Sequence, residues 1–126
     1  MTDLEPSHYY KNAEIILQTA HQTLKDFGML NHKISFSGNT ETAYQELFEQ
    51  IEPLVAKLIQ TNYQQLLDLL YRIDVNEKKV SEMLKSENKE EANFANKMTT
   101  LILNRELQKV IIRNAYSLKG NQNLEK

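Results

Sequence analysis

Residues 44–73 read YQELFEQIEPLVAKLIQTNYQQLLDLLYRI, and their apolar side chains recur at alternating steps of three and four. This spacing places them on one side of an α-helix. Such a long apolar stripe aggregates in water, so helices of this chain or of a second copy must cover it. Pro53 lies inside the segment, yet the apolar phase continues from Ile51 to Val55. We therefore predict one helix over residues 41–73, kinked at Pro53 and capped by Asn39 or Thr40.

A second apolar stripe precedes this segment and predicts a helix that begins after Ser7 and ends near Phe27. Ser7 is placed to accept hydrogen bonds from the first-turn amides, and Gly28 can adopt the left-handed conformation that ends a helix. Residues 29–38 read MLNHKISFSG and break the periodicity. We expect a long ordered loop there, with Ile34 and Phe36 packed against the helices.

Two more helices are predicted after residue 73. Asp74 and Glu77 have the spacing of a capping box, which predicts a helix start at Asp74. The last helix is expected from about Lys89 to Leu118, ended by Gly120. The prediction is an all-α fold, an up-down bundle of four principal helices in a single domain over residues 1–126, with frayed termini at 1–6 and 121–126.

Composition narrows the classes of protein that the chain can belong to. With 126 residues and a formal net charge of −2, the chain has one domain's length and no global attraction for nucleic acid. It has no cysteine, which excludes disulfides and thiolate chemistry. Its apolar runs fall far short of the ~20 residues that span a bilayer, and Met1–Ser7 lacks the features of a secretory signal. We expect a cytoplasmic protein with no membrane partner.

Histidines and carboxylates give no recognisable catalytic or metal-binding set. Glu5 and His8 have the E-x-x-H spacing of di-iron bundles, but the chain has no second copy of that pair, and Glu14 with His21 defines no coordination set. We therefore expect no metal, no cofactor and no catalytic residue. Four acidic residues on the central helix predict a solvated face, or alternatively a surface for a basic partner: Glu41, Glu46, Glu49 and Glu52.

The last helix carries two candidate interaction surfaces. Four cations recur at multiples of four and form a candidate basic stripe, which Glu106 interrupts: Lys97, Arg105, Lys109 and Arg113. Such a stripe can bind phosphate or an acidic partner, or it can be a solvent-facing side that forms ion pairs within the chain. The apolar positions of this helix cover more than one narrow stripe, which suggests a candidate oligomer face: Leu103, Leu107, Val110 and Ile111.

Three functional hypotheses follow. The leading one is a non-enzymatic protein that binds a protein partner, as an adaptor, a chaperone-like subunit or an immunity-type binder, with a candidate homodimer through the last helix. The first alternative is a nucleic-acid or phosphate-binding module that uses the basic stripe, although few aromatic residues accompany these charges. The second is a small-ligand binder or enzyme with a pocket between helices, whose sign would be a cavity into which His21 or a carboxylate points.

Overall fold

The computed structural model describes residues 12–86 and 92–124, and within these ranges it contains five α-helices and no strand. The helices are α1 (Ala13–Gly28), α2 (Ala43–Thr61), α3 (Tyr63–Ile73), α4 (Glu77–Ser86) and α5 (Ala92–Leu124). The predicted all-α class is confirmed, whereas an up-down bundle of four helices with a kinked second helix is not. Each helix in the described ranges is too short or too polar to cross a bilayer.

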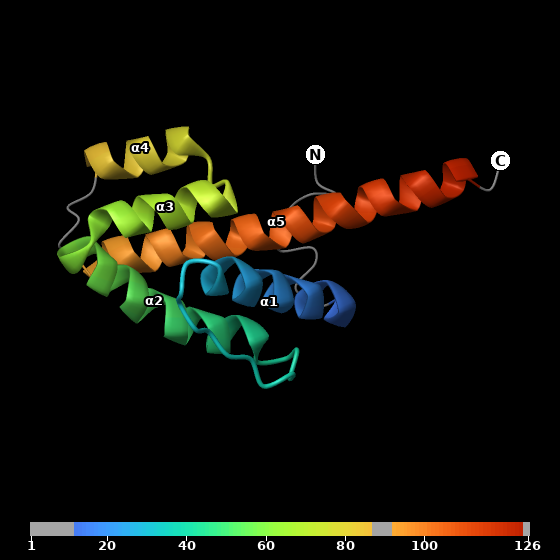
Figure 1. Cartoon of the computed structure of the whole chain (residues 1–126), viewed down its shortest axis with the longest axis horizontal. Helices are drawn as coiled ribbons and strands as arrows, with labels where there is room; N and C mark the ends of the chain where they lie inside the picture. Colours follow the sequence, from blue (N-terminus) through green and yellow to red (C-terminus); the bar gives the residue numbers. More distant parts are fainter. Residues whose placement is uncertain (1–11, 87–91, 125–126) are drawn as a thin grey trace.

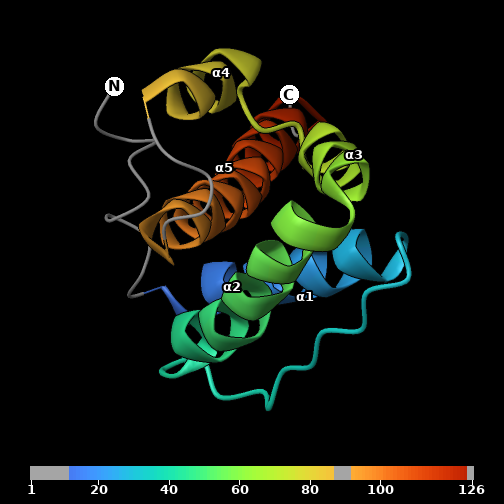
Figure 2. The same ribbon diagram turned by 90° about the vertical axis from the view of Figure 1, so that its left-hand side faces the viewer.

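Helix α5 runs through the middle of the molecule. In Figure 1, α1 and α2 lie below α5, and α3 and α4 lie above it. Figure 2 shows that α3 lies at the flank of α5, where it also contacts α1 and α2, and that α4 is the outermost helix above α5. Contacts between α5 and the helices α1, α2 and α3 form most of the tertiary structure. At its carboxyl end α5 extends beyond the other helices (Figure 1). The candidate site lies where α1, α2 and α5 meet.

The apolar stripe of residues 44–73 supplies much of the core, as its periodicity predicts. Leu58, Leu66 and Leu70 are 4%, 0% and 4% exposed, so the side chains that had to be covered are covered. Further buried residues of the same stripe are Leu47, Ile51, Val55 and Ile73. Side chains from the neighbouring helices complete the core, among them Phe27, Phe94, Met98 and Ile102.

The prediction of one unbroken helix over residues 41–73 is wrong at Asn62. This residue leaves the helical conformation, with φ −157° and ψ 73°, and separates α2 from α3. Its side-chain Oδ1 accepts a hydrogen bond from the Gln65 amide at 3.1 Å and so caps α3. Asparagine favours this arrangement because its short polar side chain competes with the helix for backbone amides. Pro53 lies within α2, whose helical assignment continues on both sides of it.

The junction between α3 and α4 also differs from the prediction. Asp74 does not cap α4; it ends α3 in the left-handed conformation, with φ 64°. Asn76 is the capping residue, because its Oδ1 accepts hydrogen bonds from the amides of Lys78 at 2.9 Å and Lys79 at 3.3 Å. Asp and Asn both suit either role, so the sequence pattern did not distinguish them.

The start of α1 is displaced from the predicted position. Asn12 is its N-cap, with the Ile15 amide donating to Oδ1 at 3.1 Å, whereas the predicted cap, Ser7, lies outside the described residues. At the other end, the left-handed residue is Asn31, with φ 66°, and not Gly28. Asparagine's tolerance of this conformation lets the turn close after the helix has ended.

Helix α5 continues past the predicted stop at Gly120 and ends at Leu124. The frayed tail expected over residues 121–126 is therefore helical up to Leu124. The expected fraying of residues 1–6 falls outside the described part of the chain, as do residues 125–126.

The segment between α1 and α2 is an ordered connection that α2 holds in place. Ile34 is buried in the core and Phe36 packs against it, as predicted. The Gln50 side chain binds both backbone groups of Ser35: Oε1 accepts from the amide at 2.9 Å, and Nε2 donates to the carbonyl at 2.8 Å. Glu46 accepts from the Ser37 amide at 2.9 Å. These bonds fix the loop that leads into the first turn of α2.

Candidate functional site

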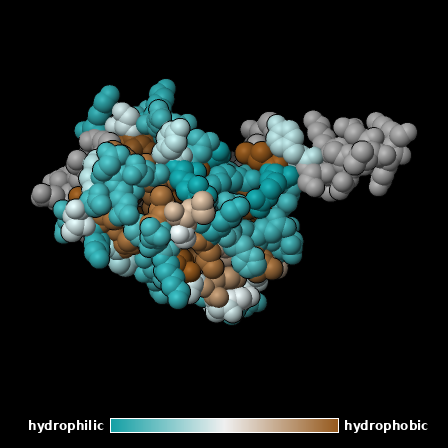
Figure 3. Space-filling model, in the orientation of Figure 1, coloured by the Kyte–Doolittle hydropathy of each residue, from teal (hydrophilic) through white to brown (hydrophobic). Residues whose placement is uncertain are grey.

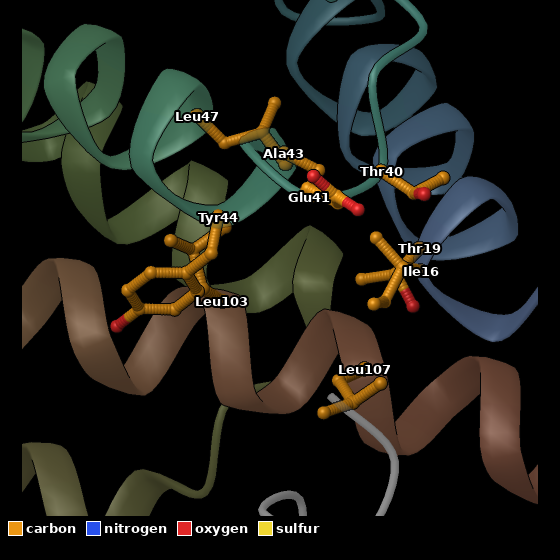
Figure 4. A pocket seen from close by; sticks show the side chains of 9 residues that line it. All are labelled: Ile16, Thr19, Thr40, Glu41, Ala43, Tyr44, Leu47, Leu103 and Leu107. Atoms are coloured by element: carbon orange, nitrogen blue, oxygen red, sulfur yellow. The ribbon is translucent and has the colours of Figure 1, made fainter. Parts of the chain in front are cut away.

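An apolar groove of about 450 Å³ lies where α1, α2 and α5 meet, and we call it the α1–α2–α5 groove (Figure 4). It falls within the usual range of ligand pockets, ~300–1,000 Å³. The connection into α2 contributes to its wall, so four separate parts of the chain build it. Its lining residues are Ile16, Thr19, Thr40, Glu41, Ala43, Tyr44, Leu47, Leu103 and Leu107.

The floor of this groove is apolar and its mouth carries two groups that can form polar contacts. Leu47, Leu103 and Leu107 are buried, whereas Tyr44 is 41% exposed and Glu41 is exposed. Figure 4 shows Tyr44 beside Leu103 at one end and Leu107 toward the other, with the Glu41 carboxylate near Ala43 and Thr40 on the side across from α5. A site of this composition can take an apolar side chain or ring while Glu41 pairs with a cation.

Local contacts fix the walls of the groove. The Tyr44 ring packs against Phe48, with centroids 5.8 Å apart, which supports the tyrosine from the next turn of α2. The Thr19 hydroxyl donates a hydrogen bond to the Ile15 carbonyl at 2.7 Å, so this donor is already satisfied within α1. The groove therefore has a preformed wall of satisfied or apolar groups, which lowers the ordering cost of binding.

A group of ionisable side chains links α1, α3 and α5, with two buried carboxyls and two partly exposed cations. Lys109 Nζ on α5 lies 2.7 Å from Asp26 Oδ2 on α1 and 2.9 Å from Glu106 Oε1, one turn before it on α5. Arg72 Nε on α3 lies 3.5 Å from Asp26 Oδ1. Glu106 is 0% exposed and Asp26 is 3% exposed. We call these four residues the internal charge cluster.

The two carboxyls of this cluster titrate in opposite directions. Burial raises the pKa of Glu106, hydrogen bonding with Asp26 raises it further, and the opposing effect of Lys109 leaves it at about 8. Burial also acts to raise the pKa of Asp26, but its hydrogen bonds with Glu106, Lys109 and Gln22 outweigh burial, so that pKa is lowered. At neutral pH Glu106 is mainly protonated, chiefly because burial disfavours its charged form, and Asp26 is ionised.

The predicted basic stripe is largely engaged within the chain. Lys109 belongs to the internal charge cluster, and Arg105 donates to Asp74 Oδ2 at 3.0 Å. Arg113 donates to Gln22 Oε1 at 2.9 Å. Lys97, near the start of α5, is partly buried and also has an interaction partner. A phosphate group would have to compete with these contacts, which favours the alternative of intrachain pairing over nucleic-acid binding.

The predicted oligomer face lies inside this single chain. Leu103, Leu107, Val110 and Ile111 are 4%, 2%, 0% and 4% exposed. The last three form a small apolar cluster with Ile15 of α1. These four side chains of α5 are therefore part of the apolar packing of the chain itself.

The four acidic residues that were predicted to share one face of the central helix have different surroundings in the structure. Glu41 lines the α1–α2–α5 groove, Glu46 binds Ser37 and Thr42, and Glu49 accepts from Gln45 at 2.9 Å. Glu52 is partly exposed. The hydrogen bonds that Glu46 accepts from Thr42 and Ser37 lower the pKa of Glu46.

Of the three histidines, His21 is exposed, His32 is partly buried, and His8 lies outside the described residues together with Glu5. Burial, with a smaller effect from Lys57, lowers the pKa of His32. No group of three or more His, Asp or Glu side chains in the described ranges is arranged to hold a metal ion.

The α1–α2–α5 groove and the internal charge cluster were not found by sequence reasoning. Glu106 did carry a signal, because it stands one turn from Ile102, Leu103 and Val110, all apolar. A carboxylate on the apolar face of a helix needs a buried partner. We interpreted Glu106 only as an interruption of the basic stripe.

Comparison of the chain with protein-family models, with curated proteins and with solved structures finds no match.

Proposed function

We propose that this protein acts without catalysis, by binding a protein partner whose apolar side chain enters the α1–α2–α5 groove. The observation that carries the proposal is the groove itself, which has an apolar floor from α2 and α5 and a mouth formed by Tyr44 and Glu41. Exposed tyrosines at the edge of apolar pockets are typical of protein interfaces. The scaffold for this role is the all-helical fold, in which α2 and α3 stand where one kinked helix was predicted.

The binding test uses two tyrosines that differ in position. A photoreactive benzoylphenylalanine replaces Tyr44 in one variant and Tyr116 in the other, and the cells that make the protein are irradiated. Tyr116 is 72% exposed on α5 and does not line the groove. We expect a covalent adduct of defined mass from position 44 and not from position 116. The proposal is wrong if position 44 yields no adduct, or if both positions yield the same set.

A second candidate function, small-molecule binding, uses the same groove. It is favoured by the presence of Glu41 in the lining, because a carboxylate in the cavity wall was the feature expected of this hypothesis. The ligand would combine an apolar body with a cationic group. Screening by ligand-observed NMR tests it: a cationic amphiphile that binds the wild type should lose its signal change in Glu41→Lys and keep it in Glu49→Lys. Binding that survives Glu41→Lys would place the ligand elsewhere.

A homodimer is part of the proposal only through surfaces other than Leu103, Leu107, Val110 and Ile111, which the chain itself covers. Light scattering after size-exclusion chromatography measures the mass directly. We expect the mass of a monomer, and a dimer that persists on dilution would restore the second subunit as the partner.

A further inference from the structure

A second groove lies on the opposite side of α5, between α3 and α4, and shares no lining residue with the α1–α2–α5 groove. We call it the α3–α4 groove; its volume is also about 450 Å³. Helix α3 lies along the flank of α5 and α4 lies above α5, so the two helices diverge from the junction that joins them (Figures 1 and 2). On the face shown in Figure 3, apolar atoms appear as separate patches in a largely hydrophilic surface.

Four apolar residues line the α3–α4 groove. Leu67 and Leu70 come from α3, Val80 comes from α4, and Val75 comes from the junction between them. The lining positions recur at steps of three and four on each helix, so each helix presents one face to the groove. A trough between two helices is the shape that accepts a third helix, with its side chains packed between theirs.

The rim of this groove is acidic. The described residues that line it include three carboxylates, Asp68, Asp74 and Glu77, and no lysine, arginine or histidine. Asp74 Oδ2 already accepts from Arg105 at 3.0 Å, but the Asp74 side chain is still 82% exposed and can accept further hydrogen bonds. An acidic rim repels phosphate, so nucleic acids and anionic lipid surfaces do not fit this groove.

Tyr71 supplies an aromatic contact beside these carboxylates. It is 82% exposed, the largest exposure among the large apolar and aromatic side chains of the described residues. A tyrosine next to carboxylates can stack against an arginine or lysine while the carboxylates bind the charged group. Tyrosine is also enriched among the residues that contribute most to protein interfaces.

We propose that the α3–α4 groove is a docking surface for a basic amphipathic helix of a partner protein. The apolar row of that helix lies between α3 and α4, and lysines or arginines at its edges pair with Asp68, Asp74 and Glu77. Because this surface is separate from the α1–α2–α5 groove, the protein can hold two partner segments at once. That is the property of an adaptor.

The test uses a synthetic peptide of leucine and lysine, about 18 residues long, with leucines at steps of three and four. At ~1.5 Å per residue its helix reaches ~27 Å. Fluorescence anisotropy measures its dissociation constant for the full chain at increasing salt. We expect binding that weakens as salt rises, and none by a matched peptide with glutamate in place of lysine.

Two double variants with the same change in net charge locate the contact. Asp68→Lys with Glu77→Lys alters the α3–α4 groove, and Glu49→Lys with Glu52→Lys alters α2, which lies across the molecule. We expect the first pair to raise the dissociation constant by about tenfold or more and the second pair to change it by less than about twofold. Tyr71→Ala, which leaves the charge unchanged, should also weaken binding.

Three outcomes overturn the proposal. The first is no binding of the basic peptide by the wild type. The second is an equal loss of peptide affinity in the two double variants, which would show that the peptide is attracted to the acidic protein as a whole and not to the α3–α4 groove. The third is a dimer, detected by light scattering, that Tyr71→Ala dissociates, which makes a second copy the occupant. Circular dichroism of each variant establishes that it is folded before its binding is measured.

Discussion

At the scale of single residues, Glu106 departs most from the apolar pattern of its helix. It is fully buried, and its pKa of about 8 means that the folded protein holds a proton that the unfolded chain releases near pH 4.5. The stability this proton contributes is fully present below pH 4.5 and is lost as the pH rises through about 8. Asp26 acts in the opposite direction: its lowered pKa contributes stability that is present above pH 3.8 and is lost at lower pH.

Glu106→Gln should remove the loss of stability that Glu106 causes as the pH rises from 4.5 to about 8. Between pH 5 and 9 the free energy of unfolding of the wild type should fall, with a slope of up to about 1.4 kcal/mol per pH unit. In the variant the free energy of unfolding should change little over this pH range, because glutamine keeps the shape of the protonated acid and cannot ionise. Urea denaturation across this pH range measures both.

Glu49→Gln is the control for Glu106→Gln, because it removes an exposed carboxyl and should leave the slope as it is in the wild type. A wild-type stability that rises from pH 5 to 9 would contradict the assignment of the proton to Glu106.

Asp74 is the second residue at which a substitution should change the free energy of unfolding measurably. Its left-handed conformation disfavours most side chains that have a Cβ. Asp74→Ala should destabilise the fold by about 1–2 kcal/mol, since alanine pays the full penalty of this conformation and loses the contact with Arg105. Asp74→Gly removes that penalty and should cost less than Asp74→Ala. Chemical denaturation of the two variants gives the comparison, and an equal or larger loss for glycine would show that the left-handed conformation costs alanine no more than it costs glycine.

At the scale of the helices, the sequence predicted the class of structure and the apolar face, but not every break. The periodicity of residues 44–73 places Leu47, Ile51, Leu66 and Ile73 correctly in the core, because burial follows directly from the step of three and four. The break at Asn62 was missed since one non-helical residue leaves that step intact on both sides. Periodicity records which side of a helix is apolar and does not record whether one backbone hydrogen bond is lost.

The internal charge cluster and both grooves could not be read from the sequence for a different reason. Lys109 and Asp26 are far apart in the chain, and only the packing of α5 against α1 brings them within 2.7 Å. The basic stripe was visible as a spacing of charges, but the spacing does not say which helix covers them. A groove likewise depends on where helices diverge, which is a property of their packing.

The cap at Asn62 gives a prediction for the element it separates. Asn62→Ala removes the side-chain bond to the Gln65 amide and should cost about 1 kcal/mol, whereas Asn62→Asp keeps an acceptor there and should cost less. Thermal unfolding followed by circular dichroism compares the two variants. Equal stability of Asn62→Ala and the wild type would show that this cap does not stabilise the junction of α2 and α3.

At the scale of the whole molecule, the cations of the basic stripe differ from the carboxylates of the two grooves. Arg105, Lys109 and Arg113 of α5 bind groups within the chain, and the basic stripe is largely occupied. The carboxylates at the two grooves, Glu41 on one side of α5 and Asp68 with Glu77 on the other, are exposed at the surface. Both grooves therefore suit partners that combine apolar and basic groups, which is the kind of partner that the proposed function requires.

The most direct test of partner binding in the α1–α2–α5 groove is quantitative affinity capture with wild type, Glu41→Lys and Glu49→Lys, followed by mass spectrometry. Both variants change the net charge equally, and only Glu41 lines the groove. We expect at least one protein to be enriched by the wild type and by Glu49→Lys and to be lost with Glu41→Lys. If the same proteins are enriched equally by all three, the groove is not the binding site and the proposed function is wrong.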